Sequence, residues 1–155
     1  MGQQQLILLV LATIIVGLAI VVGIRAFNEN SVKSNSDAMM QDLVRMANDA
    51  QAWKQKPAPF GGQGEPESSD LDNFSGLTLA ELGYPAVGGT YTNLNGDYTL
   101  VGATGTGLDL QASNTKFNNT NRIFVCGVTD TTIVGAVVTL GGAAVGTPPT
   151  ATDCP

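Results

Sequence analysis

Hydrophobic and polar positions divide the chain into three stretches with different periodicities. The first is a largely apolar run of nineteen residues without a charge, Leu6 to Ile24. A helix of this length spans roughly 28 Å, close to the hydrocarbon thickness of a bilayer. A secretory signal would have a basic start and a shorter apolar run, whereas the start here, Gln3–Gln5, is uncharged. We therefore predict a membrane-competent helix that stays on the protein.

The second stretch, from Arg25 to Lys56, has helical periodicity. Its apolar residues recur at intervals of three, four or seven and so share one helix face: Val32, Met39, Leu43, Met46, Ala50 and Trp53. We expect Met39, Leu43, Met46 and Trp53 to pack this helix on a sheet. Charged residues fill the other positions and predict a solvated face: Lys33, Asp37, Asp42, Arg45, Asp49 and Lys54.

The boundaries of this helix follow from residues that compete with or break helical structure. We predict a helix from about Gln3 to Gln55, because Pro57 and Pro59 prevent its continuation. Residues 28–36 are rich in Asn and Ser, whose side chains compete with the helical backbone. A local loosening of the helix at residues 28–36 is therefore expected as an alternative to a continuous helix.

The third stretch, after Pro57, has the residue composition typical of loops and strands. Residues 57–76 are rich in turn residues and carboxylates, and residues 77–85 suit one short helical turn. Four runs rich in Val, Ile, Thr and Tyr then predict strands at 97–103, 107–113, 122–128 and 131–140. Asn95-Gly96 is a strong hairpin signal.

These patterns predict an α+β fold, in which a long N-terminal helix packs on a small antiparallel sheet of about four strands. The helix has an apolar half, residues 1–27, and an amphipathic half, residues 28–56. A connecting loop, residues 57–89, leads to the sheet domain, residues 90–155, whose tail is rich in Gly, Pro and Thr.

The composition argues against nucleic-acid binding and against catalysis or metal binding that relies on histidine. The net charge is −6 and the chain contains no histidine. Because phosphate contacts need clustered Lys and Arg, we expect no specific nucleic-acid binding. Histidine is the commonest general base and metal ligand, so we expect no catalytic residue, no cofactor and no metal. Carboxylate-only chemistry is the enzymatic route that composition leaves open.

The two cysteines, Cys126 and Cys154, are separated by 28 positions and lack the C-x-x-C spacing of zinc or redox sites. This favours a disulfide and a location outside the cytoplasm.

Three other motifs have simpler explanations. Clustered carboxylates at Glu65, Glu67 and Asp70–Asp72 suit calcium but lack a calcium-loop spacing, and a solvated acidic loop explains them equally well. The triplets that start at Asn73 and Asn118 fit the N-glycosylation pattern, which also arises by chance.

The order of these parts resembles that of type IV pilins over the whole chain: a half-apolar, half-amphipathic helix, a loop, and a small sheet with a late cysteine pair. The segment "FSGLTLAELGYP" also resembles the pilin segment that enters the sheet. The resemblance implies a structural subunit that sits in the inner membrane and is then assembled by the pilus machinery. The product would be an extracellular helical homopolymer of this chain, with roles in adhesion or motility, and the Cys126–Cys154 disulfide would close the C-terminal region.

The resemblance places the apolar half-helix in the filament core, with Gln5, Leu6, Ile15, Gly17, Gly23 and Ile24 as assembly residues. One departure is that Gln5 or Ile7, depending on whether Met1 or Gln3 is the mature first residue, stands where pilins have a glutamate. Amide hydrogen bonds could replace that ion pair, because a buried carboxylate is costly unless paired. Pilins also have a mid-helix proline, whose loosening role Gly17 and Gly23 could take.

Two points stay open from the sequence. Small residues such as Gly17 and Gly23 let helices approach closely, but glycine is also common in membrane helices generally. The alternative functions are a pseudopilin or minor pilin of a secretion or DNA-uptake machine, and a single-pass membrane protein that displays a binding domain. Arg25 weakly favours the last alternative.

Overall fold

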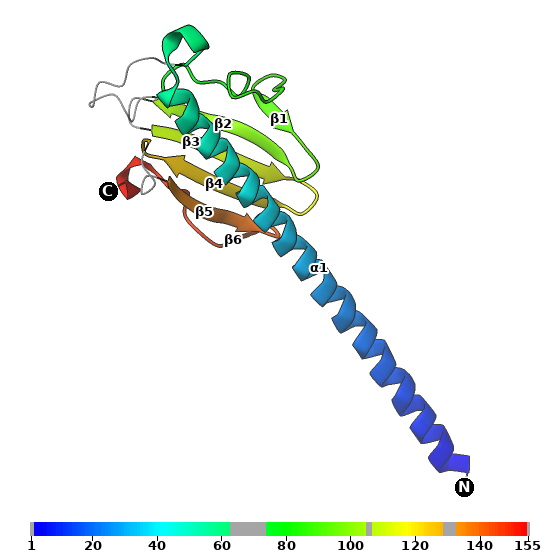
Figure 1. The fold of residues 1–155 in the computed structure, drawn as a ribbon. Helices are drawn as coiled ribbons and strands as arrows, with labels where there is room; N and C mark the ends of the chain where they lie inside the picture. Colours follow the sequence, from blue (N-terminus) through cyan, green and yellow to red (C-terminus); the bar gives the residue numbers. More distant parts are fainter. Residues whose placement is uncertain (1, 63–73, 105–106, 129–132, 155) are drawn as a thin grey trace.

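The computed structural model describes residues 2–62, 74–104, 107–128 and 133–154. One helix, α1 (Gly2–Gln55), forms the long axis of the molecule, and only its C-terminal half packs on the sheet (Figure 1). The backbone N–H of Lys56 donates to the carbonyl of Trp53 at 3.2 Å and closes the last turn before Pro57. A short 3-10 helix, η1 (Ala58–Phe60), follows.

The sheet contains six antiparallel strands among the described residues, in the order of the chain. They are β1 (Thr90–Thr92), β2 (Asp97–Thr104), β3 (Gly107–Asn114), β4 (Asn119–Val125), β5 (Ile133–Leu140) and β6 (Ala143–Ala144). The prediction of about four strands was too low because both edge strands are short. β1 has three residues, and β6 has two alanines that pair with Thr139 and Leu140.

The hairpin predicted at Asn95-Gly96 is confirmed as the turn between β1 and β2. The backbone N–H of Asn93 donates to the carbonyl of Gly96 at 3.0 Å. A Cβ at position 96 would lie 2.6 Å from the carbonyl oxygen of Ser113 and 3.0 Å from the sulfur of Met39. Glycine is required here because the turn passes so close to β3 and α1.

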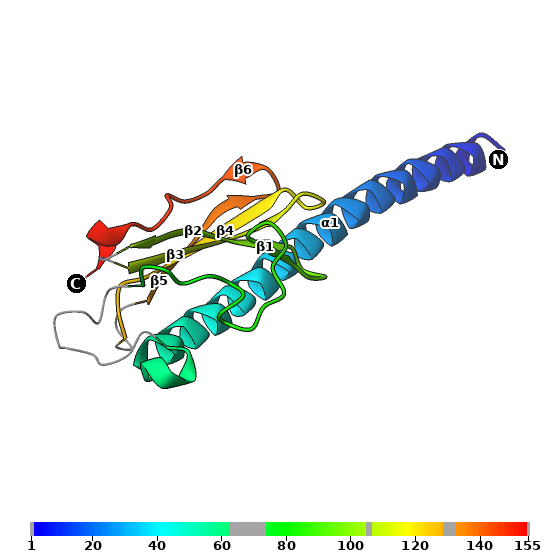
Figure 2. The same cartoon turned by 90° about the horizontal axis from the view of Figure 1, so that it is seen from above.

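The hydrophobic core lies between the C-terminal half of α1 and one face of the sheet. The predicted packing residues Met39, Leu43 and Met46 are at most 1% exposed, and Trp53 is 9% exposed. They meet buried side chains of β2, β3 and β4: Tyr98, Leu108, Leu110, Ile123 and Val125. Figure 2 shows α1 along one side of the sheet and the C-terminal segment on the other.

The connecting loop also contributes to this core. Phe74, Leu77 and Leu79 are 0%, 4% and 3% exposed. At about 25 cal/mol per Å² of apolar surface removed from water, such burial favours folding of the loop, the sheet and the C-terminal half of α1 as one unit.

The helix is continuous through residues 28–36, so the loosening considered for this stretch does not occur. Side chains of the sheet bind the polar groups that were expected to disturb the helix. Ser36 Oγ donates to Asn121 Oδ1 at 3.1 Å, and Asn121 Nδ2 donates back to the Ser36 carbonyl at 2.7 Å. Asn119 Nδ2 donates to Asn35 Oδ1 at 3.1 Å. Asn119 and Asn121 are at most 1% exposed, so these bonds form inside the interface.

The expectation of a uniformly solvated charged face was wrong at three positions. Asp42 and Asp49 are half-buried and Lys54 is 3% exposed. Tyr84 donates its hydroxyl proton to Asp49 Oδ2 at 2.5 Å. The sheet and the preceding loop therefore reach further around the helix than its apolar stripe indicates.

Candidate functional site: the exposed half of the helix

Residues 2–30 of α1, here called the stalk, are exposed at every position. Leu6, Ile15 and Ile24 are 66%, 57% and 58% exposed. The described residues from 31 onward are here called the head. Within α1, hydrogen bonding to the sheet begins at Val32, whose carbonyl accepts a hydrogen bond from Asn119. Monomeric soluble proteins rarely expose a continuous apolar surface of this size, so this surface requires a partner or an apolar solvent.

The apolar part of the stalk is self-sufficient in hydrogen bonding. Its backbone groups bond within α1, and its single polar side chain, Thr13, donates to the Val10 carbonyl at 2.8 Å. A segment without unsatisfied polar groups can enter hydrocarbon at little cost. Within the described residues, α1 is the one helix long and apolar enough to cross a membrane.

All six predicted assembly residues lie on the exposed stalk: Gln5, Leu6, Ile15, Gly17, Gly23 and Ile24. At Gly17 and Gly23 an added Cβ would meet no atom within 4 Å apart from the adjoining backbone of the helix itself. Contacts inside the subunit therefore give no reason for small residues at these positions. Any close approach that requires glycine there must come from another molecule.

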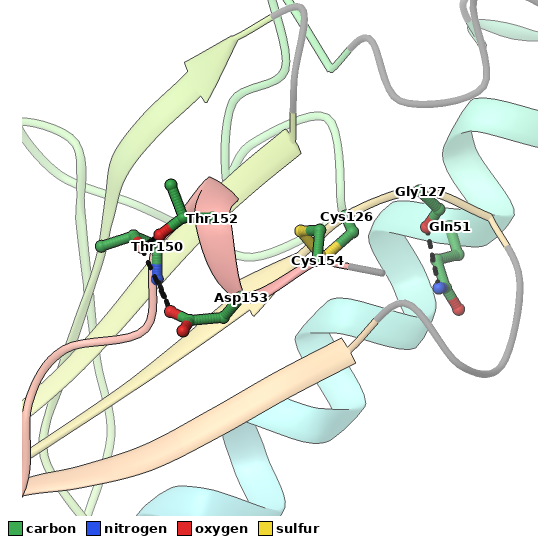
Figure 3. Close-up of a disulfide and its surroundings, with 7 residues drawn as sticks. All are labelled: Gln51, Cys126, Gly127, Thr150, Thr152, Asp153 and Cys154. Carbon is green, nitrogen blue, oxygen red and sulfur yellow. Dashed lines mark hydrogen bonds between the residues drawn. A yellow bond between two sulfur atoms is a disulfide. The ribbon is translucent and has the colours of Figure 1, made fainter.

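The predicted disulfide is present and ties the C-terminal segment to the head. Cys126 follows β4, Cys154 follows the 3-10 helix η3 (Ala151–Asp153), and their Cα atoms are 5.8 Å apart (Figure 3). The backbone N–H of Thr150 donates to Asp153 Oδ2 at 2.7 Å, which fixes the turn that carries Cys154.

Next to Cys126, the chain is also tied to α1. The Gly127 carbonyl accepts a hydrogen bond from Gln51 Nε2 at 2.9 Å (Figure 3). The last turns of α1, the end of β4 and the C-terminal segment are thus joined at one place. The strand end and the helix end should therefore move together.

Asp42 forms a polar cluster that the sequence pattern did not reveal. Its Oδ2 accepts hydrogen bonds from Tyr98 Oη at 2.6 Å, Asn95 Nδ2 at 2.8 Å and Asn93 Nδ2 at 3.0 Å. Burial raises the pKa of Asp42, but these hydrogen bonds outweigh it and hold the pKa below its ordinary value. Burial and the bond to Asp42 raise the pKa of Tyr98. The cluster fixes the β1–β2 turn against α1.

The alternation of residues in β4 is a sequence signal that could have predicted the two buried asparagines. Asn119 and Asn121 alternate with half-buried residues in β4, whose inward positions continue with Ile123 and Val125. The period of two thus places both asparagines on the core face, where a buried amide requires a partner. The partners lie in a helix more than 80 residues earlier.

The carboxylates considered for calcium, and Asn73, lie outside the described residues. Asn118 is exposed in the β3–β4 turn with a positive φ of 53°, a conformation that Asn tolerates. Among the residues that the structure describes, no group of three or more His, Cys, Asp and Glu could hold a metal ion.

Comparisons of the chain with protein-family models, with curated proteins and with solved structures found no match. What the chain does must therefore be inferred from its own surface and contacts.

Proposed function

We propose that the protein is a structural subunit of an extracellular type IV pilus-like filament, which assembles through its apolar N-terminal helix. The observation that carries this proposal is the stalk, an apolar helix that stands clear of a folded head (Figure 1). In the membrane, lipid covers this surface before assembly. In the filament, stalks of neighbouring copies cover it.

The energetics of the stalk fit two such environments. Removing about 1,000–1,500 Å² of apolar surface from water gains roughly 25–35 kcal/mol, at about 25 cal/mol per Å². Relative to lipid, most of this gain vanishes because lipid tails are as apolar as leucine. Extraction from the membrane therefore needs work from an assembly machine, while the finished filament resists dissociation into water.

The rigid junction between stalk and head favours a filament over a simple membrane anchor. An anchor needs only an apolar segment and tolerates a flexible linker. Here α1 continues unbroken from stalk to head, and Ser36 and Asn121 bind it to the sheet with two reciprocal hydrogen bonds. A fixed angle between stalk and head lets identical copies repeat one head-to-tail interface, as a helical filament requires.

The glycines of the stalk fit close packing between copies. The close approach of Ser113 requires glycine at position 96, whereas no tertiary contact within the subunit requires glycine at positions 17 and 23. Close helix packing between copies would explain glycine at these two positions, because small residues let helices approach.

Electron microscopy of material sheared from the surface of producing cells tests the proposal, with mass spectrometry to identify the chain in purified fibres. Abundant fibres built of this chain support it. If the chain stays in the membrane fraction and no fibre contains it, it is instead a single-pass membrane protein that displays its head.

A further inference from the structure

The turn between β1 and β2 contains the one Asn-Gly pair of the chain, Asn95-Gly96. This dipeptide is prone to deamidation, because glycine has no side chain to hinder the approach of its backbone nitrogen to the asparagine side chain. Both residues nevertheless have a structural reason. The close approach of Ser113 requires glycine at position 96, and Asn95 binds Asp42 of α1. The fold therefore depends on a chemically labile pair.

Deamidation at this pair takes two steps and consumes only water. The backbone nitrogen of Gly96 loses its proton to water and forms a bond to Cγ of Asn95. The bond from Cγ to Nδ2 breaks, ammonia leaves, and a succinimide ring results. Water then opens the ring at one of its two carbon–nitrogen bonds. One opening leaves aspartate, and the other leaves isoaspartate, in which the main chain runs through the former side-chain carbon.

In the folded head, hydrogen bonds hold the groups that take part in this reaction. Asn95 Nδ2, the leaving group, donates to Asp42 Oδ2 at 2.8 Å. The Gly96 N–H donates to Asn93 Oδ1 at 3.1 Å, and Gly96 is buried from the water that must take its proton. The Asn95 carbonyl accepts a further hydrogen bond from Asn35 of α1 at 2.8 Å. Ring closure therefore requires that the turn first leaves the helix.

We propose that Asn95 is a site of spontaneous modification, which its contacts with α1 protect and which deamidates when the β1–β2 turn opens. The reaction is one-way for the fold as well as for the side chain. A carboxylate at position 95 would face the carboxylate of Asp42 where an amide now donates a hydrogen bond, and two like charges so close repel each other. Isoaspartate would also lengthen the main chain of the turn. Deamidation thus permanently marks a chain whose turn has left the helix, whether or not the chain forms filaments.

The experiment follows Asn95 in the full chain in a mild detergent at mildly alkaline pH, both folded and unfolded in guanidinium. Proteolysis and mass spectrometry measure the fraction of Asn95 that becomes aspartate and isoaspartate. Because the rate follows the population of the open turn, conversion in the folded chain should be at least about ten times slower than in the unfolded chain. Equal rates would overturn the protection, and an unfolded chain without conversion would overturn the site itself.

Two variants separate opening of the turn from loss of overall stability. Asp42→Ala removes the acceptor of the Asn95 amide, so conversion in the folded chain should become at least about ten times faster. Replacing Cys126 and Cys154 with serine removes the disulfide but none of the contacts of the turn, so conversion should stay near the native rate. Equal acceleration in both variants would overturn local protection, because overall stability alone would then control the reaction.

The fluorescence of Trp53 establishes that each variant is folded during these measurements. If Asp42→Ala does not fold, Asn93→Ala takes its place, because it removes the acceptor of the Gly96 N–H. Conversion should again be faster than in the native chain, and a native rate in that folded variant would equally overturn the protection.

A last variant tests the consequence of the modification. Asn95→Asp builds the product carboxylate beside Asp42, and the urea midpoint of the head should fall by at least about 0.5 M. Asn48→Asp is the matched control, because it adds the same charge at an exposed position of α1. If the two variants are equally stable, deamidation does not prevent the turn from returning to the helix, and the one-way mark is wrong.

Discussion

Replacing Asp42 with alanine should lower the free energy of unfolding of the head by about 3 kcal/mol. One oxygen of Asp42 accepts three hydrogen bonds, from Tyr98, Asn95 and Asn93. Hydrogen bonds to a charged group contribute about 1.5–3 kcal/mol each when the partner is buried. Tyr98 is 0% exposed, so its hydroxyl would lose its partner without regaining water. The two asparagines lie in a partly exposed turn and would recover much of their loss from solvent.

Urea denaturation of the full chain in a mild detergent measures this effect, with the fluorescence of Trp53 as the reporter. Trp53 is the only tryptophan and lies in the helix–sheet interface. With a slope of about 1–3 kcal/mol per molar urea, the midpoint should fall by at least about 1 M. Asp37→Ala is the control, because Asp37 is an exposed carboxylate on the same helix and should change stability by less than about 0.5 kcal/mol.

A double-mutant cycle isolates the bond between Asp42 and Tyr98. Tyr98→Phe removes the hydroxyl donor and leaves the half-buried carboxylate with its two amide partners. In that background Asp42→Ala should cost at least about 1 kcal/mol less than in the native chain. An equal cost in both backgrounds, or an Asp42→Ala variant as stable as Asp37→Ala, would refute this account of the cluster.

Three further outcomes are expected. Replacing both Cys126 and Cys154 with serine should cost about 3–4 kcal/mol, since their loop spans 28 positions; urea midpoints equal to the native ones would contradict this. Because the folded pKa of Asp42 lies below its unfolded value of 3.8, the stability it contributes is present above that pH and lost below it. Asp42→Asn should therefore show a smaller loss of stability on acidification from pH 5 than the native chain, and an unchanged acid profile would count against the cluster. Fibres should survive molar salt and dissolve in detergent, because the proposed cohesion is apolar; dissociation by salt alone, followed by electron microscopy, would show that ion pairs hold them.

Local patterns in the sequence were enough to locate the helix and four central strands. The apolar stripe of residues 32–53 and the runs rich in β-branched residues each report burial through their periodicity. The helix was predicted from about Gln3 to Gln55, and the observed helix spans Gly2–Gln55. The edge strands β1 and β6 were missed because pieces of three and two residues are defined by their neighbours' hydrogen bonds and not by their own composition.

Local sequence patterns could not predict the polar contacts between helix and sheet. Asn and Ser disfavour a helix on their own, and the tertiary partners Asn119 and Asn121 reverse that preference at Asn35 and Ser36. Likewise, Asp42 sits on a face that its neighbours in sequence mark as solvated, while its donors come from the β1–β2 turn and β2. Such pairs are visible only once the register of the sheet on the helix is known. The disulfide was predictable because the chain offers a single possible pair.

The central claim is that the stalk holds the subunits together, and one substitution in its middle tests it most directly. Ile15 is 57% exposed in the single chain, so Ile15→Lys should leave the head folded. In a packed filament core it would bury an unpaired charge, which costs several kcal/mol. The control Ile15→Leu keeps the apolar surface. Electron microscopy of sheared surface material should show fibres for Ile15→Leu and none for Ile15→Lys, with both chains present in cells and folded by Trp53 fluorescence. Fibres of normal abundance from Ile15→Lys would contradict the account.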